Sequence, residues 1–151
     1  MTSGTKIRVL VIDDSAFVRR AVERMLATSG DIQVVGTAAD GEEGLRKAKA
    51  LRPDVVTLDI KMPRLGGLET LERLMAEQPL PVLLMSTLTQ EGAEVTLRGL
   101  ELGAMDFVDK SSVQPMSMLS LADELIAKIR ALGGARLRVR PHPAPPGPSW
   151  W

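Results

Sequence analysis

The sequence predicts a doubly wound α/β fold in which five parallel strands alternate with five helices. Short runs of Val, Ile and Leu recur along residues 7–108, each is followed by a segment with helical spacing, and no antiparallel hairpin signal intervenes. Strands and helices that alternate in this way build a parallel sheet with helices on both faces. We expect the spatial strand order 2-1-3-4-5, which is common among five-stranded sheets of this class.

The strands are predicted from short apolar runs bounded by charged residues, glycine or proline. Pro53 and Pro81 stand immediately before the third and fourth runs, so the preceding helices should end ahead of them. In chain order, the predicted strands are 7–12, 32–38, 54–58, 82–86 and 105–108.

The helices are predicted from apolar residues that recur three or four positions apart. Ser15 is the expected cap of the first helix and Gly30 its stop, and Gly133-Gly134 should end the last helix. The predicted apolar faces are Phe17, Val18, Ala21, Val22, Met25 and Leu26 in the first helix, and Met118, Leu121, Ala122, Leu125, Ile126 and Ile129 in the last. In chain order, the predicted helices are 15–28 and, approximately, 41–51, 67–78, 90–102 and 115–132.

The composition is that of a single soluble domain with a substantial core. Of 151 residues, 44% are hydrophobic and 25% charged, and 19 basic residues balance 19 acidic ones. The chain has no basic face and only 3% aromatic residues, which argues against nucleic-acid binding, and without cysteine it has no disulfides. Because it has neither a signal peptide nor an apolar run of roughly 20 residues, we expect a cytoplasmic protein without a membrane partner.

Residues 133–151 differ in composition from the domain predicted at 1–132. All 19 acidic residues lie in 1–132, where 16 basic residues leave a net charge of −3, and three arginines make the remainder +3. Five prolines fall within 141–148, so we expect a flexible Pro/Arg-rich tail or linker. Two explanations of Trp150-Trp151 stay open. The pair is the result of a truncation or reading-frame accident, or it is a docking peptide, and composition does not separate the two.

Carboxylates stand at the ends of two predicted strands that should be neighbours. Asp13-Asp14 follow the first apolar run, and Asp59 follows the third. Ligands of doubly wound sheets bind beyond the carboxyl ends of the strands where the strand order switches, here between strands one and three. Three converging carboxylates raise one another's pKa unless a cation lies among them. Their hard oxygen ligands favour Mg²⁺.

A hydroxyl and an ammonium group are predicted at the same edge of the sheet. Ser86 and Thr87 stand at the end of the fourth strand, and Lys110 follows the fifth. With the carboxylates, they are the groups needed for phosphoryl transfer to an aspartate. The predicted roles are Asp59 as nucleophile, Asp14 and Asp59 as metal ligands with Asp13 acting directly or through water, and Ser86 and Lys110 as phosphoryl-binding groups, beside Thr87.

Each of these residues also has an ordinary structural explanation. Asp13-Asp14 could cap the following helix and interact with its dipole. Asp59 could be a loop acid, Ser86 a helix cap and Lys110 a surface lysine. Their occurrence at successive strand ends on one edge favours a shared site.

Over residues 6–132 the sequence resembles the receiver domain of two-component response regulators. The matching motifs are VLVIDDS, PDVVTLDIKMP, LMST and DFVDK. A narrower resemblance, to the N-terminal receiver of chemotaxis protein-glutamate methylesterases, rests on KIRVLVIDDSAFVRR, DVVTLDIKMPRLGGLETLERLM and STLTQEGAEVTLRGLELGAMDFVDK. The resemblance implies a flavodoxin-like fold, Mg²⁺ as cofactor, a chemotaxis-type histidine kinase as phosphoryl donor, and chemoreceptor machinery as a further partner.

The resemblance also implies roles for individual residues. Asp59 matches the phosphoacceptor, Ser86 the hydroxyl position and Lys110 the lysine of the family motif, and Asp13-Asp14 match its acidic pair. Two further matches are the backbone carbonyl of Lys61, which would complete the metal shell, and Phe107, the aromatic residue whose burial reports phosphorylation. For Phe107, plain core packing is the alternative.

Phosphorylation is expected to draw Ser86 toward the phosphoryl group, which vacates space for Phe107 to move from a more exposed rotamer. The surface expected to change comprises Gln90 to Leu102, Met105 to Val108 and the face near Leu119.

The sequence departs from the family at Ser111, where most relatives have a proline, often after a cis bond. A cis non-proline bond costs about 3–4 kcal/mol, so we expect a trans bond, a less firmly aimed Lys110, and an altered rate or lifetime of phosphorylation.

The chain has no esterase triad of its own, because its only histidine is His142 in the proline-rich tail. Two function classes remain: the regulatory domain of a protein-glutamate methylesterase, and a stand-alone receiver that acts through protein contacts. A flavin binder fits poorly, because Asp13-Asp14 would repel a flavin phosphate. A haloacid-dehalogenase-type phosphatase fits poorly as well, because Lys61 stands where that class has a second aspartate.

Overall fold

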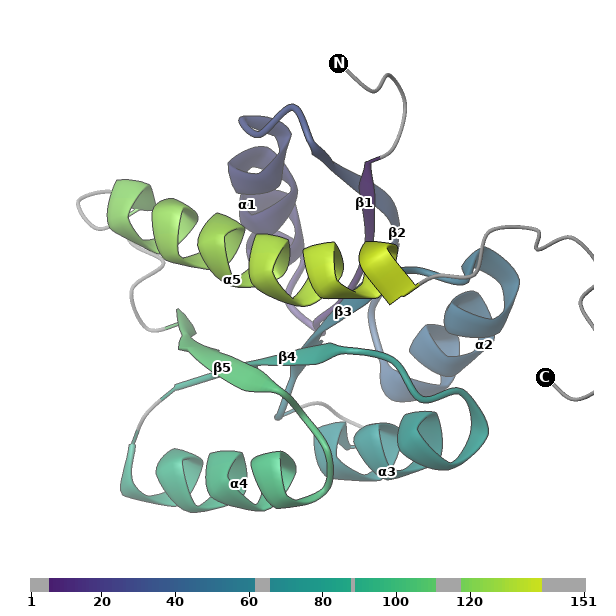
Figure 1. The fold of residues 1–151 in the computed structure, drawn as a ribbon. Helices are drawn as coiled ribbons and strands as arrows, with labels where there is room; N and C mark the ends of the chain where they lie inside the picture. The colour runs from purple at the N-terminus through teal and green to yellow at the C-terminus, as the bar shows by residue number, and fades with distance from the viewer. Residues whose placement is uncertain (1–5, 62–65, 88, 111–117, 140–151) are drawn as a thin grey trace, which may run out of the picture.

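Five parallel strands form one sheet at the centre of the molecule, in the order β2-β1-β3-β4-β5 (Figure 1). The computed structural model describes residues 6–61, 66–87, 89–110 and 118–139, without the side chains of 118–119 and 135–139. The observed sheet confirms the predicted fold class and strand order. The strands are β1 (Ile7–Ile12), β2 (Ile32–Ala38), β3 (Val55–Asp59), β4 (Val82–Ser86) and β5 (Asp106–Asp109).

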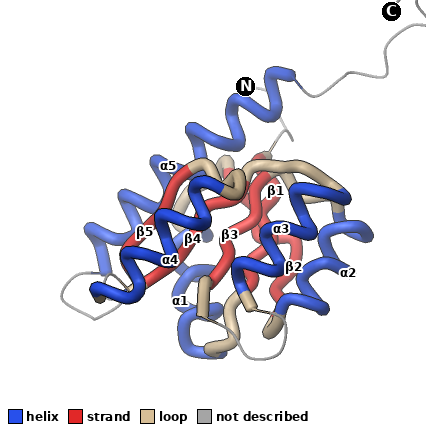
Figure 2. The backbone as a smooth tube through the Cα atoms, turned by 90° about the horizontal axis from the view of Figure 1, so that it is seen from below, coloured by secondary structure: helices blue, strands red, loops and turns tan. Residues whose placement is uncertain are grey.

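Helices cover both faces of the sheet, with α1 and α5 on one side and α2, α3 and α4 on the other (Figure 2). Successive strand residues point to opposite faces, so Val9 and Val11 pack in the cluster with α1 and α5, whereas Leu10 and Ile12 pack in the cluster with α2 and α3. The helices are α1 (Ala16–Ala27), α2 (Gly41–Leu51), α3 (Gly67–Glu77), α4 (Gln90–Glu101) and α5 (Met118–Val139).

Side-chain caps start α1 and α4 at the edge of the sheet that carries the strand ends. The Ser15 hydroxyl accepts a hydrogen bond from the Val18 backbone N–H at 3.2 Å, which confirms the predicted cap of α1. Thr89 caps α4 in the same way, by accepting from the Gly92 N–H at 3.0 Å. Both caps satisfy backbone donors that a helix leaves unpaired in its first turn.

The structure corrects the predicted place of Phe17 on the buried face of α1. The side chain of Phe17 is 64% exposed, whereas Val22 and Leu26 are buried. Phe17 stands five positions before Val22, which is about 140° around a helix with 3.6 residues per turn. An apolar residue at the margin of the helical stripe therefore reaches solvent.

The predicted end of the last helix is also wrong. α5 continues through Gly133-Gly134 to Val139, beyond the predicted end at 132. Gly133 serves close packing rather than termination, because a Cβ atom at this position would lie 2.3 Å from Cγ2 of Ile7 in β1. The division of the chain into a domain at 1–132 and a tail at 133–151 stays a prediction, and residues 140–151, with His142 and Trp150-Trp151, lie outside the described residues.

We expect Gly133→Ala to lower the free energy of unfolding by roughly 1–3 kcal/mol, because the added methyl group overpacks the contact with Ile7. At an exposed helical site the same change would instead gain about 1 kcal/mol. Urea unfolding of the variant measures the sign. Gly30→Ala is the control, because no atom of the described residues lies within 4 Å of a Cβ atom there. A stabilised Gly133→Ala variant would contradict the close approach of α5 to β1.

Among the described residues, none of the helices combines the length and the apolar character needed to cross a membrane.

Candidate functional site

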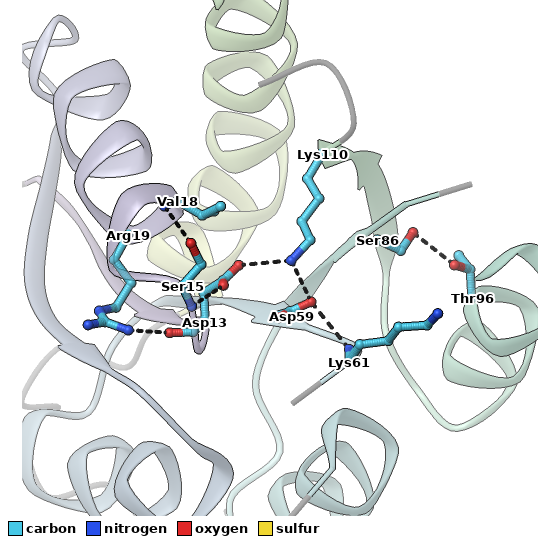
Figure 3. A network of polar contacts seen from close by, with 9 residues as sticks. All are labelled: Asp13, Ser15, Val18, Arg19, Asp59, Lys61, Ser86, Thr96 and Lys110. Atoms are coloured by element: carbon cyan, nitrogen blue, oxygen red, sulfur yellow. Dashed lines mark hydrogen bonds and ion pairs between the residues drawn. The ribbon is translucent and has the colours of Figure 1, made fainter. Parts of the chain in front are cut away.

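Parallel pairing places the ends of four strands along one edge of the sheet. Ile12 of β1 pairs with Leu58 of β3, and Ser86 of β4 pairs with Asp109 of β5. Figure 3 shows that side chains from β1, β3 and the end of β5 converge there. The predicted site residues at this edge are Asp13 after β1, Asp59 at the end of β3, Ser86 at the end of β4 and Lys110 after β5.

The turn after β1 holds Asp13 rigidly in the site. Its Oδ1 accepts a hydrogen bond from the Ser15 backbone N–H at 2.9 Å, and its backbone carbonyl accepts one from Nη1 of Arg19 at 2.6 Å. Asp13 is buried, whereas the neighbouring Asp14 is exposed. The acidic pair therefore presents one carboxylate inside the site and one at its mouth.

Lys110 bridges the two buried carboxylates. Its Nζ lies 2.9 Å from Oδ1 of Asp59 and 3.4 Å from Oδ2 of Asp13. Burial alone would lower the pKa of Lys110, but its contacts with Asp59 and Asp13 outweigh burial and raise the pKa. Lys110 is thus a fixed positive charge beside Asp59.

The single positive charge of Lys110 does not balance the negative charges of the carboxylates in the site. Burial, aided by the negative charge of Asp13, raises the pKa of Asp59 to about 7 against the opposing effect of Lys110. Burial also raises the pKa of Asp13. Oδ2 of Asp59 is buried without a hydrogen-bond partner in the part of the chain that the structure describes. An unpaired buried carboxylate oxygen is costly unless a cation or a bound group meets it.

The three carboxylates fit a small divalent cation. One oxygen each from Asp13, Asp14 and Asp59 can be chosen so that all three lie within 4.8 Å of one another. Carboxylate oxygens with an exposed side for water suit Mg²⁺, which keeps several waters when protein-bound. The donor set, the raised pKa values of Asp13 and Asp59, and the unpaired Oδ2 of Asp59 therefore agree with the predicted metal.

Lys61 lies beside the predicted nucleophile. Its backbone N–H donates to Oδ1 of Asp59 at 3.2 Å, and its side chain extends to Glu91 of α4, 3.3 Å away. Oδ1 of Asp59 is therefore held by Lys61 and Lys110, and the orphaned oxygen is the other one. Lys61 also bridges β3 and α4 across the mouth of the site.

Ser86 is at the site but turned away from Asp59. Its hydroxyl is hydrogen-bonded to Oγ1 of Thr96 in α4, at 2.9 Å (Figure 3). A hollow between these groups is lined by Asp59, Ile60, Lys61, Ser86, Thr87, Gly92 and Lys110. Thr87 thus lines the same hollow as Ser86.

Phe107 is half-buried in β5 and packs against the core cluster on the side of α2, α3 and α4. Nζ of Lys128, in α5, lies 5.3 Å from the centre of its ring and donates to its backbone carbonyl at 2.7 Å. The ring thus has core on one side and a cation on the other. Ser111 and the bond before it lie outside the described residues, as does the side chain of Leu119.

Three residues of the site were not predicted from the sequence. Arg19 holds the Asp13 turn, Thr96 binds Ser86, and Gly92 lies so close to Thr87 that a Cβ atom would be 1.9 Å from the Thr87 carbonyl oxygen. A signal was available for two of them, because the small residues Gly92, Thr96 and Gly99 recur at helical spacing and form the buried face of α4. No pattern in the sequence around Arg19 predicts its contact with the Asp13 turn.

Residues 9–122 of the chain match the sequence model of a protein family, the response regulator receiver domain. The chain belongs to this receiver family. A protein-glutamate methylesterase/protein-glutamine glutaminase of Bacillus licheniformis is 51% identical over 138 residues, which cover 91% of this receiver and 39% of that protein. The chain therefore spans about two fifths of the length of that relative.

Solved structures agree with this assignment. The response regulator domain of Thermotoga maritima CheB matches the receiver with a TM-score of 0.78 and 44% identity, over 85% of this chain and 97% of that one. A chain of the CheX-CheY-BeF3-Mg complex of Borrelia burgdorferi matches with a TM-score of 0.69 and 28% identity, over 83% and 91%. The resemblance to receivers of the methylesterase type is confirmed.

Proposed function

We propose that the receiver takes a phosphoryl group onto Asp59 from a chemotaxis-type histidine kinase and thereby regulates a protein-glutamate methylesterase domain. The main support for this proposal is the different bonding of the two carboxylate oxygens of Asp59. Oδ1 forms an ion pair with Lys110, whereas Oδ2 is buried and has no hydrogen-bond partner among the described residues. An anchored carboxylate with one uncommitted oxygen is arranged as a nucleophile.

In the transfer, a carboxylate oxygen of Asp59 forms a bond to phosphorus while the bond from phosphorus to the donor histidine nitrogen breaks. Lys110, 2.9 Å from Asp59, stays charged and neutralises negative charge on the phosphoryl oxygens. Ser86 and Thr87 line the hollow beside Asp59 and would donate to those oxygens. Catalysis by the chain is then mainly positioning and charge neutralisation.

Asp13, Asp14 and Asp59, with the backbone carbonyl of Lys61, would hold Mg²⁺. When bound, the ion offsets the charge of the three carboxylates and of the incoming phosphoryl group. The fit of the oxygen cluster supports this assignment. A further support is that a solved chain similar to this one belongs to a complex of CheX and CheY with BeF3 and Mg²⁺.

The output would pass through α4, β5 and α5. Ser86 would turn toward the phosphoryl group and Phe107 would follow. Two of the three exposed large hydrophobic residues of the described chain, Leu97 and Met105, belong to α4 and to the residue before β5. Exposed apolar side chains on a surface that changes are suited to contact another domain, and the greater length of the methylesterase relatives supports such a domain here.

Amide chemical shifts with Mg²⁺, beryllium chloride and excess fluoride test this proposal. We expect shifts at Asp59, Ser86 and Lys110 from binding, and at Phe107 from the conformational change. An Asp59→Asn variant should show neither. Binding without a change around Phe107 would refute the switch, and no binding by the wild type would refute the phosphoacceptor role.

A further inference from the structure

A buried hydrogen bond joins the phosphoryl-binding hydroxyl to helix α4. Oγ of Ser86 and Oγ1 of Thr96 are 2.9 Å apart, and both residues are almost fully buried, at 3% exposure each. Oγ1 of Thr96 also lies 2.7 Å from the carbonyl oxygen of Gly92, one turn earlier in the helix. In so buried a setting a hydrogen bond is electrostatically stronger than in water, so each contact is a defined interaction.

The two contacts of Thr96 decide the direction of the bond to Ser86. A hydroxyl has one proton to donate and two lone pairs to accept with. The carbonyl of Gly92 can only accept, so the Thr96 proton goes to it, in the manner of threonines that bond back to the preceding helical turn. The proton between the hydroxyls then comes from Ser86. The donor that the phosphoryl group requires is already committed to α4.

We propose that Thr96 is a positioning residue that holds Ser86 turned away from Asp59, so that phosphorylation must break the Ser86–Thr96 hydrogen bond and thereby release the contact of β4 with α4. This inference rests on the proposed function. It adds a residue outside the phosphoryl site that sets the balance between the two positions of Ser86.

The packing of α4 explains how release of one bond would be transmitted. Gly92 leaves no room for a side chain against the Thr87 carbonyl, and Thr89 caps the helix by accepting from the Gly92 N–H. The first turn of α4 is therefore closely fitted to the loop after β4, and Thr96 is the next buried residue along that face. Because of this close packing, a change in the position of Ser86 would displace α4 as a whole and not one side chain alone.

Thr96→Val is expected to bind the phosphate mimic more tightly than the wild type. Valine keeps the shape of threonine but cannot accept the proton of Ser86, so the turned-away position loses its partner. A buried neutral hydrogen bond of ordinary strength corresponds to roughly a 2- to 10-fold change in the population of the competent state, and hence in apparent affinity. Thr96→Ser, which keeps the hydroxyl, should stay near the wild type.

Thr70 offers a matched control in α3. It is also fully buried, and its Oγ1 bonds back to the carbonyl of Gly66 at 2.8 Å, but it does not bond to Ser86. Thr70→Val therefore removes the same kind of helical back-bond without touching the site. Thr96→Val should lose more stability than Thr70→Val, because it also removes the bond to Ser86. Only Thr96→Val should change the affinity for the mimic.

The experiment titrates the 151-residue chain with beryllium fluoride at saturating Mg²⁺ and follows amide shifts of Ser86 and of residues 92–99. Tighter binding by Thr96→Val but not by Thr70→Val supports the proposal. Equal or weaker binding by Thr96→Val, with the wild type binding normally, overturns it. Absence of binding by the wild type would instead refute the proposed function, so the two failures are distinct.

A double-mutant cycle guards against loss of folding in the valine variant. Ser86→Ala, Thr96→Ser and Thr96→Val, with the two double variants, are compared by urea unfolding without the mimic. Thr96→Val should cost less stability in the Ser86→Ala background than in the wild type, whereas Thr96→Ser should not depend on the background. Additive effects of Ser86→Ala and Thr96→Val would overturn the proposal.

Discussion

In metal-free buffer at pH 8, Asp59→Asn is expected to be more stable than the wild type by roughly 1–4 kcal/mol. Burial, with the charge of Asp13 nearby, raises the pKa of Asp59 to about 7 from its ordinary 3.8, so its ionised form is unfavourable in the folded state. Each pKa unit corresponds to roughly 1.4 kcal/mol, which sets the upper limit. Asparagine has a similar shape and carries no charge. Urea unfolding measures the difference.

The same pKa shift predicts how the difference depends on pH. Below pH 3.8 the carboxyl group is protonated in both the folded and the unfolded wild type, so its charge costs nothing. As the pH rises toward 7, the folded state retains a proton that the unfolded state has lost, and the wild type loses stability relative to the variant. The advantage of Asp59→Asn should therefore grow from pH 4 to pH 7 and then level off.

Asp54 supplies the control for this experiment. It is as buried as Asp59, but its Oδ2 accepts the Arg8 backbone N–H at 2.9 Å. Asp54→Asn should not stabilise the protein, because the carboxylate is already used by a backbone donor. If Asp59→Asn were instead less stable than the wild type, by an amount that grows as the pH rises above about 4, the ion pair with Lys110 would outweigh burial, and the proposed excess of negative charge would be wrong.

Lys110→Met is expected to destabilise the protein by roughly 3–5 kcal/mol at pH 8 and to prevent phosphorylation. The change removes the ammonium that lies 2.9 Å from Asp59 and 3.4 Å from Asp13, which leaves buried carboxylates without compensation. Chemical unfolding gives the first value, and the intact mass after incubation with acetyl phosphate gives the second.

Lys128→Met is the matched control for Lys110. Lys128 also lies near two acidic residues, Asp106 at 3.5 Å and Glu124 at 2.9 Å, but these are more exposed to solvent. The expected loss is about 1 kcal/mol or less, with phosphorylation retained. Equal losses for the two lysines would show that Lys110 is an ordinary surface ion-pair partner. Adding Asp59→Asn to Lys110→Met should recover part of the lost stability.

The strands and the acidic edge of the sheet were predictable because their determinants are local. An apolar run followed by a polar residue marks a strand end, and parallel pairing brings such ends together regardless of detail. Asp13, Asp59, Ser86 and Lys110 all followed from that rule. The strand positions were accurate to within one residue for the same reason, with β3 and β5 each displaced by one.

The errors and omissions concern interactions that depend on packing. Glycine at 133 is ambiguous in sequence, since it either ends a helix or permits close approach, and only the nearness of Ile7 decides between them. Phe17 is apolar but stands outside the stripe that meets the sheet. The bond between Ser86 and Thr96 joins a strand end to the interior of a helix, and it requires the docking of α4 to be known.

Mass spectrometry of the intact chain after incubation with acetyl phosphate tests the central claim most directly. We predict that the wild type gains one phosphoryl group in the presence of Mg²⁺, does not gain it with chelator, and that Asp59→Asn does not gain it under either condition, while Asp54→Asn does. A phosphoryl adduct on Asp59→Asn, or none on the wild type, would contradict the assignment of Asp59 as the phosphoacceptor.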